Sequence, residues 1–224
     1  MSPEIAHYLG TVMRRKPGDM LRVFNGRDGE WLAEIADLGK RGGALICRDL
    51  LREQVAGPDL WLMFAPVKRA RTDFIIEKAV EMGVARICPV FTDHTNSERV
   101  RPERMVAQVR EAAEQCGRLD MPEIAAAAKL SSVLAEWDPE RALIFADEGR
   151  AGAGGGAGGG AGAIPAAPAA VLIGPEGGFS EPERRAITAI STAVPVALGP
   201  RILRADTAAV AALTMWQMAA GDWQ

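Results

Sequence analysis

The stretch Leu60-Trp-Leu-Met-Phe-Ala65 decides the fold, because it is an unbroken apolar run of strand length. A strand with one face in water alternates apolar and polar residues, whereas a strand that is covered on both faces is apolar throughout. The run therefore predicts a strand inside a parallel sheet with helices on both sides. Since parallel neighbours need a crossover connection, we expect a helix to follow.

Strand and helix signals alternate on the C-terminal side of this run. Gly83 and Gly117 stand where two helices should end, and Pro102 stands where the second of them should begin. The expected helices are 73–82, 103–116, 131–137 and 208–220, and the further expected strands are 86–91, 142–146, 170–173 and 194–198. This alternation over 59–220 predicts an α/β fold with a mostly parallel sheet.

The N-terminal part has a different pattern. Short apolar segments alternate there with turns that contain Gly, at 16–19, 25–29 and 39–43, which is typical of a small β-domain or barrel; the expected strands are 20–24, 30–35 and 44–48. A nearly pure Gly and Ala stretch at 149–168 can bury few side chains, so we expect a flexible surface loop there. The sequence thus predicts a β-domain over 1–56 and an α/β domain over 57–224.

Composition limits the kinds of function. The formal net charge of −3 argues against a protein that coats nucleic acid through bulk electrostatics, so any RNA contact should be local. Three widely spaced cysteines and two histidines match neither a disulfide framework nor a metal-ligand spacing, and no metal cofactor is expected. The chain shows no secretory signal and no apolar run of about eighteen residues, so we expect a cytoplasmic protein without a membrane partner.

A glycine-rich loop, Ile173-Gly-Pro-Glu-Gly-Gly-Phe-Ser180, connects one expected strand to the next helix. Ser180 and Glu183 form a capping-box pattern, so the helix should begin directly after Ser180. Glycines let the backbone pass close to a ligand, but Glu176 would repel phosphate and no Gly-Lys-Ser/Thr pattern follows. The loop therefore suits ribose hydroxyls, an adenine amine or a positive charge. A tight turn without a ligand is the alternative that this loop alone leaves open.

A second loop, Gly199-Pro-Arg-Ile-Leu-Arg-Ala-Asp-Thr207, precedes the last expected helix. Asp206 lies at the start of that helix, where the helix dipole stabilises a negative charge. Arg201 and Arg204 flank two apolar residues in a turn beside the expected ligand site, where an RNA phosphate or a base carbonyl would meet them. Pairing of both arginines with surface carboxylates is the alternative.

The two loops together resemble the RsmE family of 16S ribosomal RNA uracil-N3 methyltransferases, which belong to the SPOUT superfamily. The resemblance extends over almost the whole chain, through His7, Lys16–Asp19, Phe24–Gly26, Lys68, Glu77–Ala79, Glu81 and Glu114–Arg118. It implies a PUA-like β-barrel followed by a SPOUT domain, whose parallel sheet ends in a C-terminal trefoil knot. It also implies S-adenosylmethionine as cofactor, a homodimer, and the 16S ribosomal RNA of the small ribosomal subunit as substrate.

Within this resemblance, roles can be suggested for individual residues. Cofactor contacts are expected at Ile173, Gly174, Pro175, Glu176, Gly177, Leu198, Gly199, Ile202 and Leu203. Arg204 is expected to stabilise the negative charge that develops on uracil during methylation at N3, and Asp206 is a second catalytic candidate, as proton acceptor. RNA contacts are expected at Arg14, Arg15, Lys16, Lys68, Arg69, Arg71, Arg118 and Arg201, with ordinary solvated charges as the alternative.

The sequence departs from the family pattern in two places. Family members usually carry an extra strand before the segment that matches His7, so the β-domain is expected to lack its first strand. Ala205-Asp-Thr207 stands where the family commonly has Thr-Glu-Thr, so the carboxylate is shorter by about one methylene. Three other functions stay open: methylation of another RNA, a non-catalytic role in RNA binding or ribosome assembly, and a nucleotide-phosphate enzyme, which Glu176 and the missing lysine disfavour.

Overall fold

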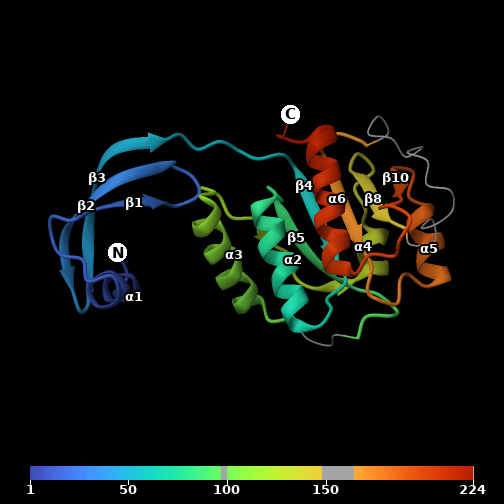
Figure 1. Ribbon diagram of the computed structural model, residues 1–224, viewed down its shortest axis with the longest axis horizontal. Helices are drawn as coiled ribbons and strands as arrows, with labels where there is room; N and C mark the ends of the chain where they lie inside the picture. Colours follow the sequence, from blue (N-terminus) through green and yellow to red (C-terminus); the bar gives the residue numbers. More distant parts are fainter. Residues whose placement is uncertain (97–99, 148–163, 224) are drawn as a thin grey trace. The chain divides into compact units, whose positions relative to one another are not determined.

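The computed structural model describes residues 1–96, 100–147 and 164–223. The chain divides into two compact units, Met1–Ala56 and Gly57–Gln224 (Figure 1). Most of the Gly and Ala stretch that was expected to form a surface loop at 149–168 lies outside the described residues, which resume at Ile164. None of the helices in the described ranges is long and apolar enough to cross a membrane.

The N-terminal unit contains an antiparallel sheet of three strands in the order β1-β2-β3, namely β1 (Met20–Phe24), β2 (Glu30–Gly39) and β3 (Gly42–Arg52). All three lie where short strands were expected, although β2 and β3 are longer. A helix that the sequence pattern did not indicate precedes them, as α1 (Pro3–His7) and the π-helical turn η1 (Tyr8–Val12). Ser2 caps this helix by accepting a hydrogen bond from the Ile5 amide at 3.3 Å.

The C-terminal unit is built on a sheet in which every described strand pair is parallel, as the unbroken apolar run predicted. Its strand order is β10-β8-β9-β4-β5-β6, and the short β7 also pairs with β5. The strands are β4 (Leu60–Phe64), β5 (Arg86–Phe91), β6 (Glu123–Ile124), β7 (Ala128–Lys129), β8 (Ala142–Ala146), β9 (Ala169–Ile173) and β10 (Ala193–Val196).

Helices cover both faces of this sheet (Figure 1). One core contains Leu60, Leu62 and Phe64 of β4 together with α2 (Arg69–Glu81), α3 (Pro102–Cys116) and α6 (Ala205–Ala220). Met63 faces the other core, which is closed by α4 (Leu130–Ala135) and α5 (Glu181–Thr188). The two burial patterns explain why the strand is apolar at every position, because alternate side chains enter different cores.

Helix starts differ most from the sequence-based expectations. α2 begins at Arg69 rather than at residue 73, and α6 begins at Ala205 rather than at residue 208. The N-cap residues Lys68 and Arg204 provide no side-chain cap, so the usual Ser, Thr, Asp or Asn signal is missing at both positions. By contrast, α3 begins at Pro102 and ends before Gly117, whose φ of 72° allows the chain to leave the helix.

The last three strands of the chain, β8, β9 and β10, are neighbours in the sheet, but their order in the sheet differs from their order in the sequence. β8 lies between β9 and β10, so β10 returns past β9 to pair with β8. This order is consistent with the knotted topology that the resemblance implies. Because all three strands are parallel, the segments that follow them emerge at one edge of the sheet, where ligands bind in open α/β folds.

Candidate functional site

A cleft of about 580 Å³, including its open mouth, lies at the carboxyl ends of β8, β9 and β10. Both loops that sequence analysis singled out contribute to its walls. The lining residues are Ala146, Asp147, Ile173, Gly174, Pro175, Glu176, Gly178, Val196, Leu198, Gly199, Arg201, Ile202, Leu203, Ala205 and Ala208. Of the nine predicted cofactor contacts, only Gly177 does not line the cleft, and it is the immediate neighbour of two residues that do.

The first loop ends in the capping box that its sequence predicts. Ser180 Oγ accepts a hydrogen bond from the Glu183 amide at 3.3 Å, and Glu183 Oε2 accepts one from the Ser180 amide at 2.9 Å. Within the loop, the Gly178 amide donates to the Pro175 carbonyl at 3.0 Å, and Gly178 has a φ of 69° that strongly favours glycine. The loop is therefore shaped by local hydrogen bonds before any ligand binds.

A turn at 92–95, directly after β5, supports this loop from a distant part of the sequence. The Asp93 amide donates to Glu183 Oε1 at 2.8 Å, and Ser180 Oγ donates to Asp93 Oδ2 at 2.5 Å. His94 Nδ1 lies 3.0 Å from the Gly177 carbonyl oxygen and 3.1 Å from that of Gly178. Because both partners are acceptors, Nδ1 carries the proton. Sequence reasoning assigned no site role to His94; its only signal was its place after the carboxyl end of a buried strand.

The second loop forms another wall of the cleft. Gly199 has a φ of 112° and no atom within 4 Å of the position that a Cβ would take, so its backbone is open on that side. Ile202 is 76% exposed at the mouth. Arg201 lines the cleft, whereas Arg204 does not and is exposed as the N-cap of α6. In the part of the chain that the structure describes, the Arg204 guanidinium has no hydrogen-bond or ion-pair partner.

Asp147 is a cleft residue that sequence reasoning missed. It follows β8 directly, lines the cleft, and its side chain is only 12% exposed. Its carboxylate pairs with Arg184 of α5. The only signal for Asp147 in the sequence is its place directly after the strand at 142–146, because a residue at the carboxyl end of a parallel strand reaches the edge where ligands bind. The sequence pattern does not show that the neighbours of this strand are β9 and β10, which carry the two cleft loops.

The predicted catalytic and RNA-contact residues of the C-terminal unit are dispersed. Lys68 and Arg69 are exposed around the start of α2. Arg71, two residues further, pairs instead with Glu176 of the first loop and lies 3.8 Å, from Nε to Oδ2, from Asp206. Asp206 Oδ1 also accepts a hydrogen bond from the Thr207 amide at 2.9 Å. The second catalytic candidate is thus engaged with an arginine from another helix.

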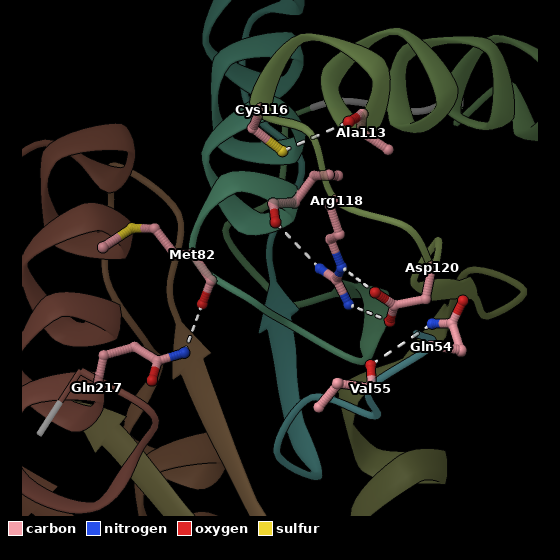
Figure 2. A network of polar contacts seen from close by, with 9 residues as sticks. Gln54, Val55, Met82, Ala113, Cys116, Arg118, Asp120 and Gln217 are labelled. Carbon is pink, nitrogen blue, oxygen red and sulfur yellow. Dashed lines mark hydrogen bonds and ion pairs between the residues drawn. The ribbon is translucent and has the colours of Figure 1, made fainter. Parts of the chain in front are cut away.

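Arg118 lies away from the cleft in a network of its own (Figure 2). Its guanidinium donates to Asp120 at 2.8 and 2.9 Å and to the Val80 carbonyl at 3.0 Å, and its side chain is 11% exposed. These hydrogen bonds hold the pKa of the Asp120 carboxyl below its ordinary value. Such contacts are those of a structural arginine. In the N-terminal unit, Arg14, Arg15 and Lys16 are all exposed, as an RNA contact would require.

The chemistry of the cleft follows from its lining. Apolar side chains such as Ile173, Leu198 and Leu203 offer a surface for a flat ring, while Glu176 and Asp147 offer carboxylate oxygens. No group of three metal-binding side chains comes together within residues 1–96, 100–147 and 164–223. The apolar and carboxylate lining of the cleft suits an organic ligand with an apolar ring and with hydroxyl or cationic groups.

Comparison with known proteins gives two family matches. A model described as an RNA methyltransferase domain matches residues 56–217, and a model described as an RNA methyltransferase PUA domain matches residues 2–45. The first match falls almost entirely within Gly57–Gln224 and the second within Met1–Ala56. The two compact units of the structure are thus similar to two different known domains.

Individual relatives are similar over most of the chain. A Rickettsia conorii protein named ribosomal RNA small subunit methyltransferase E is 31% identical over 92% of this chain and 84% of its own length. The crystal structure of a protein of the same name from Neisseria gonorrhoeae, bound to S-adenosyl methionine, superimposes with a TM-score of 0.83 at 26% identity, covering 100% of this chain and 92% of the other. A Legionella pneumophila structure with bound SAM gives 0.81 at 30% identity, covering 99% and 92%.

Proposed function

Since the chain belongs to the RNA methyltransferase family whose PUA and methyltransferase domains it contains, we propose that it methylates 16S ribosomal RNA at N3 of a uridine, with S-adenosylmethionine as donor. The substrate is the assembled small ribosomal subunit in the cytoplasm. The observation that carries the proposal is the cleft formed by both glycine-containing loops at the carboxyl ends of β8, β9 and β10.

The residues of the cleft fit this donor. The adenine ring would pack between the apolar walls, at Ile173, Leu198 and Leu203, and the backbone groups of both loops would hold its polar edge. Carboxylates at Glu176 and Asp147 suit ribose hydroxyls and the positive charge of the molecule. When bound, the sulfonium supplies a methyl carbon for in-line displacement, so the main task of these residues is to hold the donor in one orientation.

The acceptor requires a second set of groups at the mouth of the cleft. Methylation at uracil N3 removes a proton, and a cation beside a uracil carbonyl oxygen stabilises the charge that develops. Arg204 suits this role because its guanidinium is exposed and has no partner among the described residues. Asp206 is the weaker candidate for proton acceptor, since it is already engaged with Arg71.

The reaction can be tested directly. Purified protein is incubated with labelled S-adenosylmethionine and with small subunits from a strain that lacks the modification, and the nucleosides are analysed by mass spectrometry. Appearance of 3-methyluridine is the expected result. Cofactor binding with methylation of a different RNA would contradict the proposed substrate, and binding of ATP without S-adenosylmethionine would contradict the proposed donor.

The role of Arg204 can be tested by mutation with a matched control variant. Arg204→Ala should lower kcat by about 100-fold, the size of effect seen when one stabilising donor is lost, while the Kd for S-adenosylmethionine changes less than about twofold because Arg204 does not line the cleft. The control is Arg185→Ala, because Arg185 is also exposed but lies on α5; this variant should keep the kcat and the cofactor Kd of the wild type. Equal rates in wild type and Arg204→Ala would remove this residue from the mechanism.

We further propose two sets of RNA contacts. Arg201, Lys68 and Arg69 serve the methyltransferase unit, and the exposed run Arg14–Lys16 serves the PUA unit. Replacing all three residues of this run by alanine should weaken RNA binding and reduce the slope of log affinity against log salt by roughly 2 to 3, because each phosphate contact contributes a slope of about 0.7 to 0.9. An unchanged salt dependence would show that the run does not contact phosphate.

A homodimer is the third part of the proposal. The end of α6 and the residues after it leave two large apolar side chains exposed, Met218 at 67% and Trp223 at 50%. A second copy would cover these side chains, since exposed apolar patches mark interaction surfaces. Light scattering should give twice the chain mass for the wild type and a lower mass for Met218→Glu. A monomeric wild type would contradict this part.

A further inference from the structure

Arg71 connects the two walls of the cleft. It is the third residue of α2, and its side chain is 25% exposed. Its Nη1 pairs with Glu176 Oε1 on the first loop, while its Nε lies 3.8 Å from Asp206 Oδ2 in the first turn of α6. Glu176 lines the cleft, and Asp206 directly follows Ala205, which lines it too. One guanidinium therefore joins two segments that are 30 residues apart in the sequence and that both border the cleft.

The chemistry of the side chain matters for this connection. A guanidinium presents donors in several directions from a rigid plane, so it can serve two carboxylates at once, whereas the ammonium of lysine is a compact point charge. Without the cation, the carboxylates of Glu176 and Asp206 would leave two negative charges close together with no cation between them. Arg71 thus replaces mutual repulsion of the two walls by attraction to a shared partner.

Arg71 and Asp206 join α2 and α6 near the beginnings of both helices, and a second contact joins the two helices near their C-terminal ends. Gln217 Nε2 of α6 donates to the Met82 carbonyl at the C-cap of α2 at 2.7 Å (Figure 2). Arg71 and Met82 are 11 residues apart, as are Asp206 and Gln217, which corresponds to about 16 Å of helix in both cases. The two helices therefore run alongside each other in parallel, and α2 holds the first turn of α6 in a defined position.

We propose that Arg71 is a positioning residue for the cofactor, which holds the two loops at the separation that S-adenosylmethionine requires, and that it is not an RNA contact. This inference rests on the proposed function. It also gives Asp206 the role of an anchor for Arg71 in place of proton acceptor. Arg71 does not line the cleft, so its effect on the ligand is transmitted through Glu176 and through the start of α6.

The chain offers a matched control on the same helix. Lys78 of α2 is 26% exposed and also has two carboxylate partners, Glu77 and Glu81, each at 2.7 Å. None of the three lines the cleft. Lys78→Met and Arg71→Met therefore remove a cation of similar burial and similar pairing, and they differ in whether the partners belong to the cleft.

The experiment measures the Kd for S-adenosylmethionine by calorimetry, with RNA affinity measured on the same variants. Arg71→Met should raise the cofactor Kd on the order of 10-fold, within the range found for coupled sites, and Arg71→Lys should recover part of this loss. Lys78→Met should stay within about twofold of the wild type. Asp206→Asn should weaken binding in the wild type but add little in Arg71→Met, because the two residues act through one contact.

Three results of these binding measurements would each contradict a different part of the reasoning. A cofactor Kd that is unchanged in Arg71→Met, with reduced RNA affinity, would overturn the inference and make Arg71 an RNA contact. Equal losses in Arg71→Met and Lys78→Met would also overturn it, because the effect would then come from α2 stability. A wild-type protein that binds no S-adenosylmethionine would overturn the proposed function itself.

Discussion

Gln217 is a buried polar side chain whose replacement should destabilise the methyltransferase unit. It is 0% exposed on α6. Its Nε2 donates to the Met82 carbonyl at 2.7 Å (Figure 2). Its Oε1 accepts a hydrogen bond from the Asp222 amide at 3.0 Å. Gln217→Met keeps the length of the side chain and removes both hydrogen bonds. The substitution thus tests the polar contacts without creating a large cavity.

The magnitude follows from the groups left behind. The Met82 carbonyl is buried, and loss of its partner should cost about 1–3 kcal/mol. The Asp222 amide lies beyond the end of α6 and is only partly buried, so water can replace its partner at a cost below about 1 kcal/mol. We therefore expect a loss of about 2 kcal/mol in the free energy of unfolding, or roughly 4–8 °C in Tm for a unit of this size.

Urea unfolding followed by tryptophan fluorescence measures this loss, because the buried Trp216 lies beside Gln217 in α6. Gln108→Met, the same chemical change at a half-buried position of α3, is the control and should stay within about 0.5 kcal/mol of the wild type. A change below about 0.5 kcal/mol in Gln217→Met as well would refute the reasoning, since the buried Met82 carbonyl would then not depend on Gln217.

Three further predictions concern other parts of the same unit. Gly177→Ala would place a Cβ 3.2 Å from the His94 Cβ, so it should weaken S-adenosylmethionine binding several-fold by calorimetry while RNA affinity stays unchanged. The Arg141 guanidinium beside Asp59 holds the pKa of that carboxyl below its ordinary value, so the stability it contributes is present above about pH 4 and is lost as pH falls through the lowered pKa. Asp59→Asn should therefore be less stable than the wild type at pH 7, and this difference should shrink as the pH falls below about 4, as measured by thermal unfolding. Burial raises the pKa of the Cys88 thiol to about 11, so iodoacetamide at pH 8 should modify it more slowly than either exposed cysteine, as followed by mass spectrometry.

Local patterns were sufficient to predict much of the fold. The expected strands at 86–91 and 142–146 have the bounds of β5 and β8, because both segments are mainly apolar and of strand length. The capping box at Ser180 and Glu183 is also present, since its hydrogen bonds join residues three positions apart. The helix at the N-terminus was missed, because it is short and its second half is a π-helical turn without a sequence pattern of its own.

The sequence by itself determined the two cleft loops, because glycines, prolines and capping residues act on their own backbone. Only the tertiary structure decided what supports these loops. His94 reaches Gly177 across 83 positions, and Arg71 reaches Glu176 across 105. Such contacts depend on which strands are neighbours, and alternation of strands and helices predicts a parallel sheet without its strand order. Arg71, expected from its charge to contact RNA, lies between two carboxylates because β9 pairs with β4, the strand before α2, and because α6 packs against α2.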